Sequence, residues 1–343
     1  MREFKGFKKG VNLGGWLSQC DNNDYSEQRF STFITASDFD RIASWGLDHV
    51  RLPFDYNVVM NDSGEFIESG FKWLDFAVEQ CEKRGLNIVL DLHKTAGFVF
   101  DDASYCSFFE DERLQELFFA LWREMSKRYG EKKNVVFELL NEVTELRFAK
   151  KWNELAAKAI TEIRKLAPNT PIMYGGIRNN SIYGLTLLEK PADDNVVFDF
   201  HCYSPLVFTH QNAYWVPELS HGFSMEYPQT ERFILEKTRG FFGNIFDDEF
   251  DQENSGMMNQ TYFERLFSTA KQISEKFDVP LYCGEYGVID QADPESTVNW
   301  YKDINAALEK MNIARAAWTY KQKDFGLIDE HYSDVADRLK KLL

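Results

Sequence analysis

Short apolar runs alternate with longer amphipathic runs along most of the chain. The short runs are typical of buried strands and lie at residues 10–13, 49–53, 87–93, 135–140, 172–174, 196–200, 280–283 and 314–318. We expect the second of them to end at Pro53. The longer runs repeat apolar residues with a helical period and lie at residues 71–84, 114–129, 149–166, 181–189, 296–311 and 335–343. Further helices are expected after Thr35 and near Tyr262. Eight strands that alternate with helices predict parallel βα units, and their number favours a closed (β/α)8 TIM barrel over an open doubly wound sheet.

One interval interrupts this alternation. Residues 204–260, between the sixth strand and the next helix, are too many for an ordinary connection in a compact domain. The interval contains Trp215 and apolar clusters such as Phe241 and Phe242. We therefore predict one domain over residues 1–343, with residues 204–260 as a helical subdomain inserted after strand six, over the active-site cleft.

Composition excludes several classes of partner. The 343 residues carry a formal net charge of −16, which would repel nucleic acid and anionic membranes, and no apolar run is long enough to span a bilayer. The five cysteines form no CxxC pair and are expected to be free thiols. The first residues, MREFKGFKKG, lack the apolar region of a signal peptide. We expect a monomer, either cytoplasmic or secreted with its signal peptide removed.

Polar and aromatic side chains follow almost every predicted strand. They are Arg51, Asp91, His93, Asn141, Glu142, His201, Tyr203, Glu285 and Trp318. A single glutamate after a strand is more often a helix cap or a solvated loop residue, and a single histidine is more often a core residue. In a TIM barrel, however, the carboxyl ends of all strands face the active site. The whole set at one rim therefore indicates an active site.

Two carboxylates across one barrel mouth suit glycoside hydrolysis, in which one protonates the leaving oxygen and the other is ionised. Strands four and seven lie opposite each other in an eight-stranded barrel, so Glu142 and Glu285 can meet over its centre. Asn141 would then donate to a sugar 2-hydroxyl, while Arg51 and Tyr203 would hold Glu285 ionised. The remaining candidates would bind or orient: His93 and His201 as partners of hydroxyls or of the acid, and Trp318, Trp16 and Trp215 as sugar-stacking aromatics.

Several stretches of the sequence resemble glycoside hydrolase family 5, the cellulase family A. They are GVNLGGW (10–16), HVRLPFDY (49–56), VLDLH (89–93), FELLNE (137–142), FHCYSP (200–205), LYCGEYGV (281–288) and AAWTYK (316–321). The resemblance implies that Glu142 is the acid/base and Glu285 the nucleophile of a retaining enzyme, with no metal and no other cofactor. It is strongest to clostridial-type endo-β-1,4-glucanases with a helical insertion after strand six. Two residues depart from the family pattern, Val143 in place of a proline and Lys94 in place of a second histidine.

We therefore predict a retaining endo-β-1,4-glucanase that acts on cellulose or mixed-linkage β-glucan. Two alternatives within the family are a β-1,3-glucanase and a β-mannanase. A metal-dependent hydrolase is disfavoured, because the first strand ends in Asn12-Leu13-Gly14-Gly15 without the HxH pair that is common in barrel amidohydrolases. A non-catalytic carbohydrate-binding barrel is the alternative of another class, although it would be expected to lack one of the two carboxylates.

Overall fold

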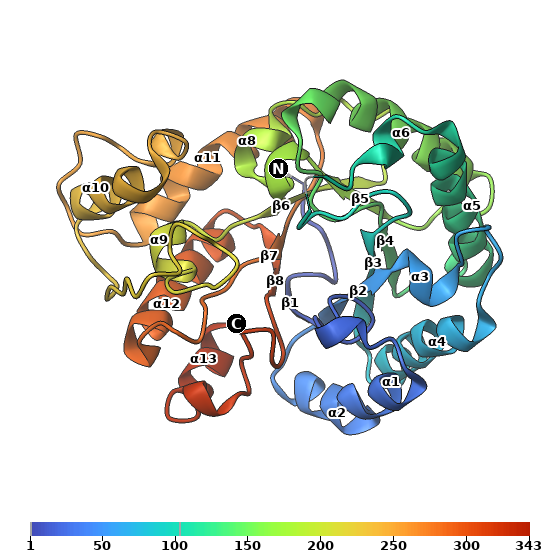
Figure 1. Ribbon diagram of the computed structural model, residues 1–343, viewed down its shortest axis with the longest axis horizontal. Helices are drawn as coiled ribbons and strands as arrows, with labels where there is room; N and C mark the ends of the chain where they lie inside the picture. Colours follow the sequence, from blue (N-terminus) through green and yellow to red (C-terminus); the bar gives the residue numbers. More distant parts are fainter. Residues whose placement is uncertain (1, 103) are drawn as a thin grey trace.

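Eight parallel strands form a closed barrel in the computed structural model, which describes residues 2–102 and 104–343. The strands follow one another around the barrel in chain order, and β1 pairs with both β2 and β8 (Figure 1). They are β1 (Lys9–Asn12), β2 (His49–Asp55), β3 (Asn87–Lys94), β4 (Val135–Glu138), β5 (Ile172–Gly175), β6 (Val196–His201), β7 (Leu281–Glu285) and β8 (Ala314–Ala317). This topology confirms the predicted (β/α)8 barrel.

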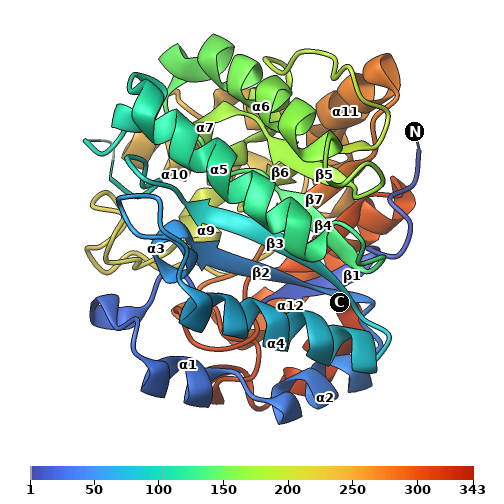
Figure 2. The same ribbon diagram turned by 90° about the vertical axis from the view of Figure 1, so that its right-hand side faces the viewer.

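Helices surround the barrel because each presents one apolar stripe to the strands and a charged face to solvent. In Figure 2, β2 and β3 are seen between α5 above and α4 below. The α-helices are α1 (Glu27–Phe33), α2 (Ala36–Ser44), α3 (Tyr56–Val59), α4 (Glu68–Lys83), α5 (Glu112–Tyr129), α6 (Ala149–Arg164), α7 (Ile177–Asn180), α8 (Ile182–Leu185), α9 (Leu206–Thr209), α10 (Glu231–Phe242), α11 (Gln260–Phe277), α12 (Pro294–Lys310) and α13 (Ala336–Leu342). The 3-10 turns are η1 (Asp21–Asn23), η2 (Ser107–Phe109), η3 (Leu146–Phe148), η4 (Asp247–Glu249) and η5 (Glu330–Tyr332). The expected helix after Thr35 begins with a capping box between Thr35 and Asp38.

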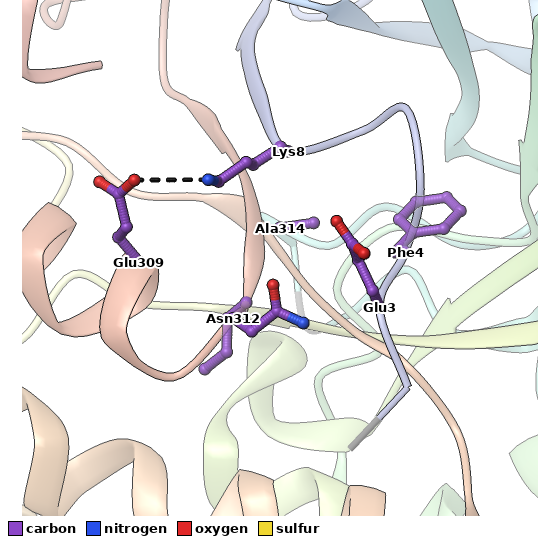
Figure 3. A pocket seen from close by; sticks show the side chains of 7 residues that line it. Glu3, Phe4, Lys8, Glu309, Asn312 and Ala314 are labelled. Carbon is purple, nitrogen blue, oxygen red and sulfur yellow. Dashed lines mark hydrogen bonds and ion pairs between the residues drawn. The ribbon is translucent and has the colours of Figure 1, made fainter.

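The amino-terminal segment closes the end of the barrel where the strands begin. Phe4 and Phe7 stack on each other and pack with Tyr282 and other side chains of the barrel interior. Beside them lies a hollow of about 10 Å³, and Lys8 pairs with Glu309 there at 3.4 Å. Figure 3 shows the side chains that line it. A space of this size holds about one water molecule. This hollow is therefore too small for a ligand larger than water, and the segment contributes packing at this end of the barrel.

Residues 204–260 leave the barrel after β6 and return to it at α11. They contain α9, α10 and η4, which lie at the left of Figure 1. The start of α10 is tied to α11 by Glu231, a buried carboxylate that accepts hydrogen bonds from Arg265, from Asn254 and from the backbone of Asp251. A paired and hydrogen-bonded carboxylate at this position holds the interval against the barrel wall.

Several predicted boundaries differ from those of the structure, and two of the differences are informative. Strand β2 continues through Pro53 to Asp55, because Pro53 lies beyond the last β1–β2 pair, Asn12–Arg51, and its missing N–H removes no bond of that ladder. The helix expected over residues 181–189 is shorter in the structure, where α8 spans only Ile182–Leu185. It follows the left-handed residues of α7. The five cysteines are free, as expected. In the described ranges no helix has both the length and the apolar character to span a membrane.

Gly70 and Gly240 make a matched pair for testing how closely α4 packs against α3. A Cβ on Gly70, in α4, would lie 1.7 Å from the carbonyl oxygen of Val58, whereas a Cβ on Gly240, in α10, would have no heavy atom within 4 Å. We expect Gly70→Ala to lower the free energy of unfolding by about 3 kcal/mol through overpacking. Gly240→Ala should raise it by about 0.5–1 kcal/mol, because alanine favours the helix. Urea denaturation measures both, and equal effects would show that the α4 contact is not tight.

Candidate active site

Arg51 lies at the centre of the site and is fully buried inside the barrel. Its Nε and Nη2 donate to the two oxygens of Glu138 at 2.7 Å each, and its Nη1 donates to Glu285 Oε1 at 2.7 Å. Its Nη2 also lies 3.0 Å from Asp91 Oδ2 and donates to Asn141 Oδ1 at 2.9 Å. One guanidinium thus holds side chains from β3, β4 and β7 in fixed relative positions, as its planar fork of donors allows.

Glu285 ends β7 and is held at both oxygens. Arg51 donates to Oε1, and the hydroxyl of Tyr203 donates to Oε2 at 2.9 Å. Burial and then the charge of Glu285 raise the pKa of Tyr203 well above its usual value, so the hydroxyl keeps its proton and remains a donor. These two hydrogen bonds fix the orientation of the Glu285 carboxyl.

Glu142 lies four residues after β4, with a φ of 41°. Its Oε1 lies 2.7 Å from Nδ1 of His201, and one of its oxygens lies within 4.8 Å of an oxygen of Glu285. Retaining glycosidases hold their two carboxyl groups about 5–5.5 Å apart, whereas inverting ones need about 6.5–9.5 Å to admit a water. The spacing of Glu142 and Glu285 therefore fits retaining chemistry.

His201 lies between the two glutamates and a third carboxylate. Its Nδ1 faces Glu142 and lies 3.6 Å from Glu285 Oε2, and its Nε2 lies 3.3 Å from Asp199. Burial alone would lower the pKa of His201, but Glu285 and Asp199 outweigh burial and raise it well above the usual value. The imidazole is therefore a cationic donor between carboxylates.

His93 and Trp318 line the site, and Asn141 is buried next to Arg51. The rings of His93 and Trp318 stack at 5.8 Å with an angle of 3° between their planes. Burial lowers the pKa of His93 to about 3, so it is neutral, and its Nδ1 lies 2.6 Å from Asp91. The Asn141 amide accepts from Arg51 through its oxygen, while its buried Nδ2 has no partner among the described residues. A buried donor without a partner points to a ligand that accepts from it.

A cleft of about 1570 Å³ opens above these residues. Its lining includes Glu142, Glu285, Trp318 and, from the interval after β6, Tyr214 and Trp215. Trp215 is 42% exposed and lies near Phe325, so its ring is available to a ligand. Ordinary small-molecule pockets measure about 300–1000 Å³, so this cleft has room for an oligomeric ligand.

The structure corrects one of the predicted substrate contacts. Trp16 is completely buried, donates its ring N–H to the carbonyl of Phe30 and packs edge-on against Phe39, Trp73 and Phe76. It does not line the cleft. Its position after β1 suggested the rim, but the chain turns outward there, and the indole fills the space between the barrel and the first helices.

The sequence predictions missed Glu138 and Asp199, which are fully buried beneath the site. Both interrupt apolar strands, as Asp91 does, and a charged residue within such a run is the signal that could have revealed them. Asn179 was also missed: its Nδ2 donates to Glu142 Oε2 at 3.2 Å, from a loop with no apolar pattern. His210, which lines the cleft and packs edge-on against Tyr203, was missed as well.

Two trios of side chains have the spacing of metal ligands, Glu142 with His201 and Glu285, and Glu138 with Asp199 and His201. Their oxygens are already engaged, because Arg51 donates to both oxygens of Glu138, and Arg51 and Tyr203 donate to Glu285. We interpret both trios as hydrogen-bonded clusters and assign no ion to them.

Comparison with known proteins gives concordant results. A family model described as cellulase (glycosyl hydrolase family 5) matches residues 8–324. Cellodextrinase A of Ruminococcus flavefaciens is 45% identical over 317 residues, which are 92% of this chain and 86% of that protein. Endoglucanase C of Acetivibrio thermocellus is 38% identical over 342 residues, 98% of each chain. Among solved structures, endoglucanase Cel5A from the hyperthermophilic Thermotoga maritima superposes with a TM-score of 0.77 at 26% identity, covering 98% of this chain and 97% of the other.

Arg51 should contribute to stability in a pH-dependent way. Burial raises the pKa of Asp91 to about 8 and that of Glu138 well above its usual value, while Arg51 opposes both shifts. A carboxyl with a raised folded pKa destabilises the fold progressively as the pH rises through that value. Arg51→Met leaves these carboxyls unpaired, so we expect a loss of about 3–5 kcal/mol in the free energy of unfolding at about pH 8 and a smaller loss at about pH 5.5.

The double variant Arg51→Met/Glu138→Gln should recover part of the loss at the higher pH, because one unpaired carboxyl is removed. Urea denaturation at both pH values measures these effects. If Arg51→Met lowers the free energy of unfolding by the same amount at both pH values, the proposed charge balance is contradicted.

Proposed function

The chain belongs to glycosyl hydrolase family 5, and within this family we propose that it is a retaining endo-β-1,4-glucanase with Glu142 as acid/base and Glu285 as nucleophile. One observation carries the assignment of roles: an oxygen of Glu142 lies within 4.8 Å of an oxygen of Glu285, and the two carboxyls have different partners. Glu285 accepts from Arg51 and Tyr203, which suits an ionised nucleophile. Glu142 lines the open cleft, where it can reach a glycosidic oxygen.

The reaction then runs in two displacements. In the first, Glu285 attacks the anomeric carbon to form a glycosyl ester, while Glu142 gives its proton to the departing glycosidic oxygen. In the second, Glu142 takes a proton from water, the resulting hydroxide attacks the anomeric carbon, and Glu285 leaves as a carboxylate. The sugar product has the same anomeric configuration as the substrate, and both carboxyls return to their initial protonation states.

The other candidate residues would act on the sugar at the reaction centre. Asn141 has a free amide donor, which suits a hydrogen bond to the 2-hydroxyl that strengthens in the oxocarbenium-like transition state. Trp318 presents a ring at the base of the cleft, stacked on the neutral imidazole of His93. His201 would hold the Glu142 carboxyl in position through its Nδ1, both when Glu142 is protonated and when it is ionised.

A β-1,4-linked glucan is the substrate we propose, as cellulose, mixed-linkage glucan or shorter cellodextrins. The size of the cleft supports an oligomeric ligand, and the names of the two relatives, cellodextrinase A and endoglucanase C, support this class of glucan. Of the two departures from the family pattern, Val143 is fully buried. Lys94 lines the cleft, 3.8 Å from Asp101 and above the ring of Phe100. Lys94 is therefore the departure that can contact a sugar.

Residues 204–260 would form a subdomain that builds one wall of the cleft. Tyr214 is 77% exposed and Trp215 42% exposed, and both line the cleft, as does Ile245. Exposed aromatic side chains in a cleft suit the apolar faces of sugar rings. A non-catalytic sugar-binding barrel would use the same aromatics, but it would not need two carboxylates at the spacing of a retaining enzyme.

Hydrolysis of a panel of polysaccharides tests the substrate. We expect activity on carboxymethylcellulose, lichenan and cello-oligosaccharides, and at least about tenfold lower kcat/KM on laminarin and mannan, which corresponds to about 1.4 kcal/mol of transition-state discrimination. Activity on laminarin alone would identify a β-1,3-glucanase, and activity on mannan alone a β-mannanase. Binding without hydrolysis of any of them would favour the non-catalytic barrel.

Chemical rescue tests the roles of the two carboxyls. Glu285→Ala should reduce kcat by several orders of magnitude, because the covalent intermediate can no longer form. Added azide should restore turnover of an aryl β-glycoside by attacking from the vacated side, so the product should be the α-glycosyl azide. Rescue of the same variant to a β-glycosyl azide would contradict the role of Glu285. As a control, Glu142→Ala should instead yield the β-glycosyl azide.

A further inference from the structure

Three consecutive residues in α7 adopt a left-handed backbone. The φ angles of Arg178, Asn179 and Asn180 are 57°, 56° and 51°, and none of the three is a glycine. Left-handed residues other than glycine are uncommon, and each costs free energy that the surrounding structure must offset. Such a run at the rim of an active site, after β5 (Figure 2), suggests that it positions a functional group.

The backbone of this segment is bonded to the residues that follow Glu142. The N–H of Arg178 donates to the carbonyl of Thr144, and the N–H of Asn179 donates to the carbonyl of Val143, each at 3.2 Å. Asn180 anchors the other end, where its Nδ2 donates to Asp199 at 2.8 Å. The left-handed turn is therefore fixed both to the loop that carries Glu142 and to the charged cluster beneath the site.

The side chain of Asn179 completes the link. Its Nδ2 donates to Glu142 Oε2 at 3.2 Å, while His201 faces Oε1 at 2.7 Å. Glu142 itself has a φ of 41°, so its carboxyl is presented from an unusual backbone conformation. Both oxygens of this carboxyl thus have a partner, one from β6 and one from the segment after β5.

We propose that Asn179 is a positioning residue for the acid/base: its amide holds the Glu142 carboxyl toward the glycosidic oxygen and favours the ionised form that Glu142 needs as the base of the second displacement. This inference rests on the proposed function. An amide nitrogen can only donate, so its contact strengthens when Glu142 is ionised and weakens when Glu142 is protonated. Asparagine suits the position because it tolerates the left-handed conformation better than most residues.

Other ionisable groups also face Glu142 and remain when Asn179 is replaced. They are His201 and Tyr203 from β6 and the segment after it, and Glu285 from β7. Arg178 lies next in sequence to Asn179, but its guanidinium is over the ring of Tyr183 at 5.0 Å and donates to the carbonyl of Ile245. Since Asn179 does not titrate, its replacement by glycine removes one hydrogen bond to Glu142 and adds no charge.

The pH profile of kcat/KM on cellotetraose tests this role, because its alkaline limb follows the loss of the acid's proton in the free enzyme. Asn179→Gly keeps the left-handed backbone and removes the donor. We expect the alkaline limb to move to higher pH by about half a unit to one unit, the size expected for loss of one hydrogen bond to a charged group. Asn179→Asp, which also tolerates this backbone, places a second carboxyl beside Glu142, and the limb should move further in the same direction.

Two variants serve as controls. Asn22 has a φ of 55°, lines the same cleft and, in the described part of the chain, forms no hydrogen bond to Glu142, so Asn22→Gly should leave the position of the limb unchanged. Glu142→Gln should abolish the alkaline limb if Glu142 is the acid. Thermal denaturation of every variant separates these effects from loss of the fold.

The outcomes distinguish the inference from the proposed function. An alkaline limb that persists in Glu142→Gln overturns the acid/base role and, with it, the inference. The second outcome is that the alkaline limb disappears in Glu142→Gln but does not move in folded Asn179→Gly and Asn179→Asp. This outcome overturns only the inference, and Asn179 is then a structural residue. A shift in Asn22→Gly as large as that in Asn179→Gly also overturns it, because the effect would not depend on the bond to Glu142.

Discussion

The pairing of Arg51 with buried carboxylates is the interaction on which the site depends. Five carboxyl groups, Asp91, Glu138, Glu142, Asp199 and Glu285, surround two cationic groups near the barrel axis, Arg51 and His201. Burying unpaired charge is costly, so this arrangement persists only because each guanidinium donor meets an oxygen and because burial raises the pKa values of Asp91 and Glu138. The interior of the barrel is thus built around charge balance as well as apolar packing.

The two glutamates have different hydrogen-bonding partners, which suits the different roles proposed for them. Glu285 accepts hydrogen bonds from two donors, the guanidinium of Arg51 and the hydroxyl of Tyr203. Glu142 lies at the edge of the cluster and faces the cleft, with a histidine cation and an amide as partners. Two carboxyls in different environments can therefore act as nucleophile and acid/base at one pH, the division of labour that retaining hydrolysis needs.

The loops around the rim adapt this common centre to a particular ligand. The interval after β6 adds exposed aromatic side chains, Tyr214 and Trp215, to a cleft whose floor is Trp318. The segment after β5 is hydrogen-bonded to the loop after β4, and through Asn179 to Glu142 itself. The strands carry Glu285 and Arg51, whereas the loops carry Glu142 and the exposed aromatic side chains of the cleft.

The sequence by itself determined the order of strands and helices, the barrel and the two glutamates at strand ends, because apolar periodicity and residue spacing are local properties. Only the tertiary structure showed that Arg51 on β2 also reaches Glu138, and that Asn179 reaches Glu142 across 37 positions. It also buried Trp16, whose place near the rim in sequence suggested a sugar contact. Side-chain direction and contacts between distant strands depend on how the barrel closes and how each loop turns. A local sequence pattern does not predict either of these.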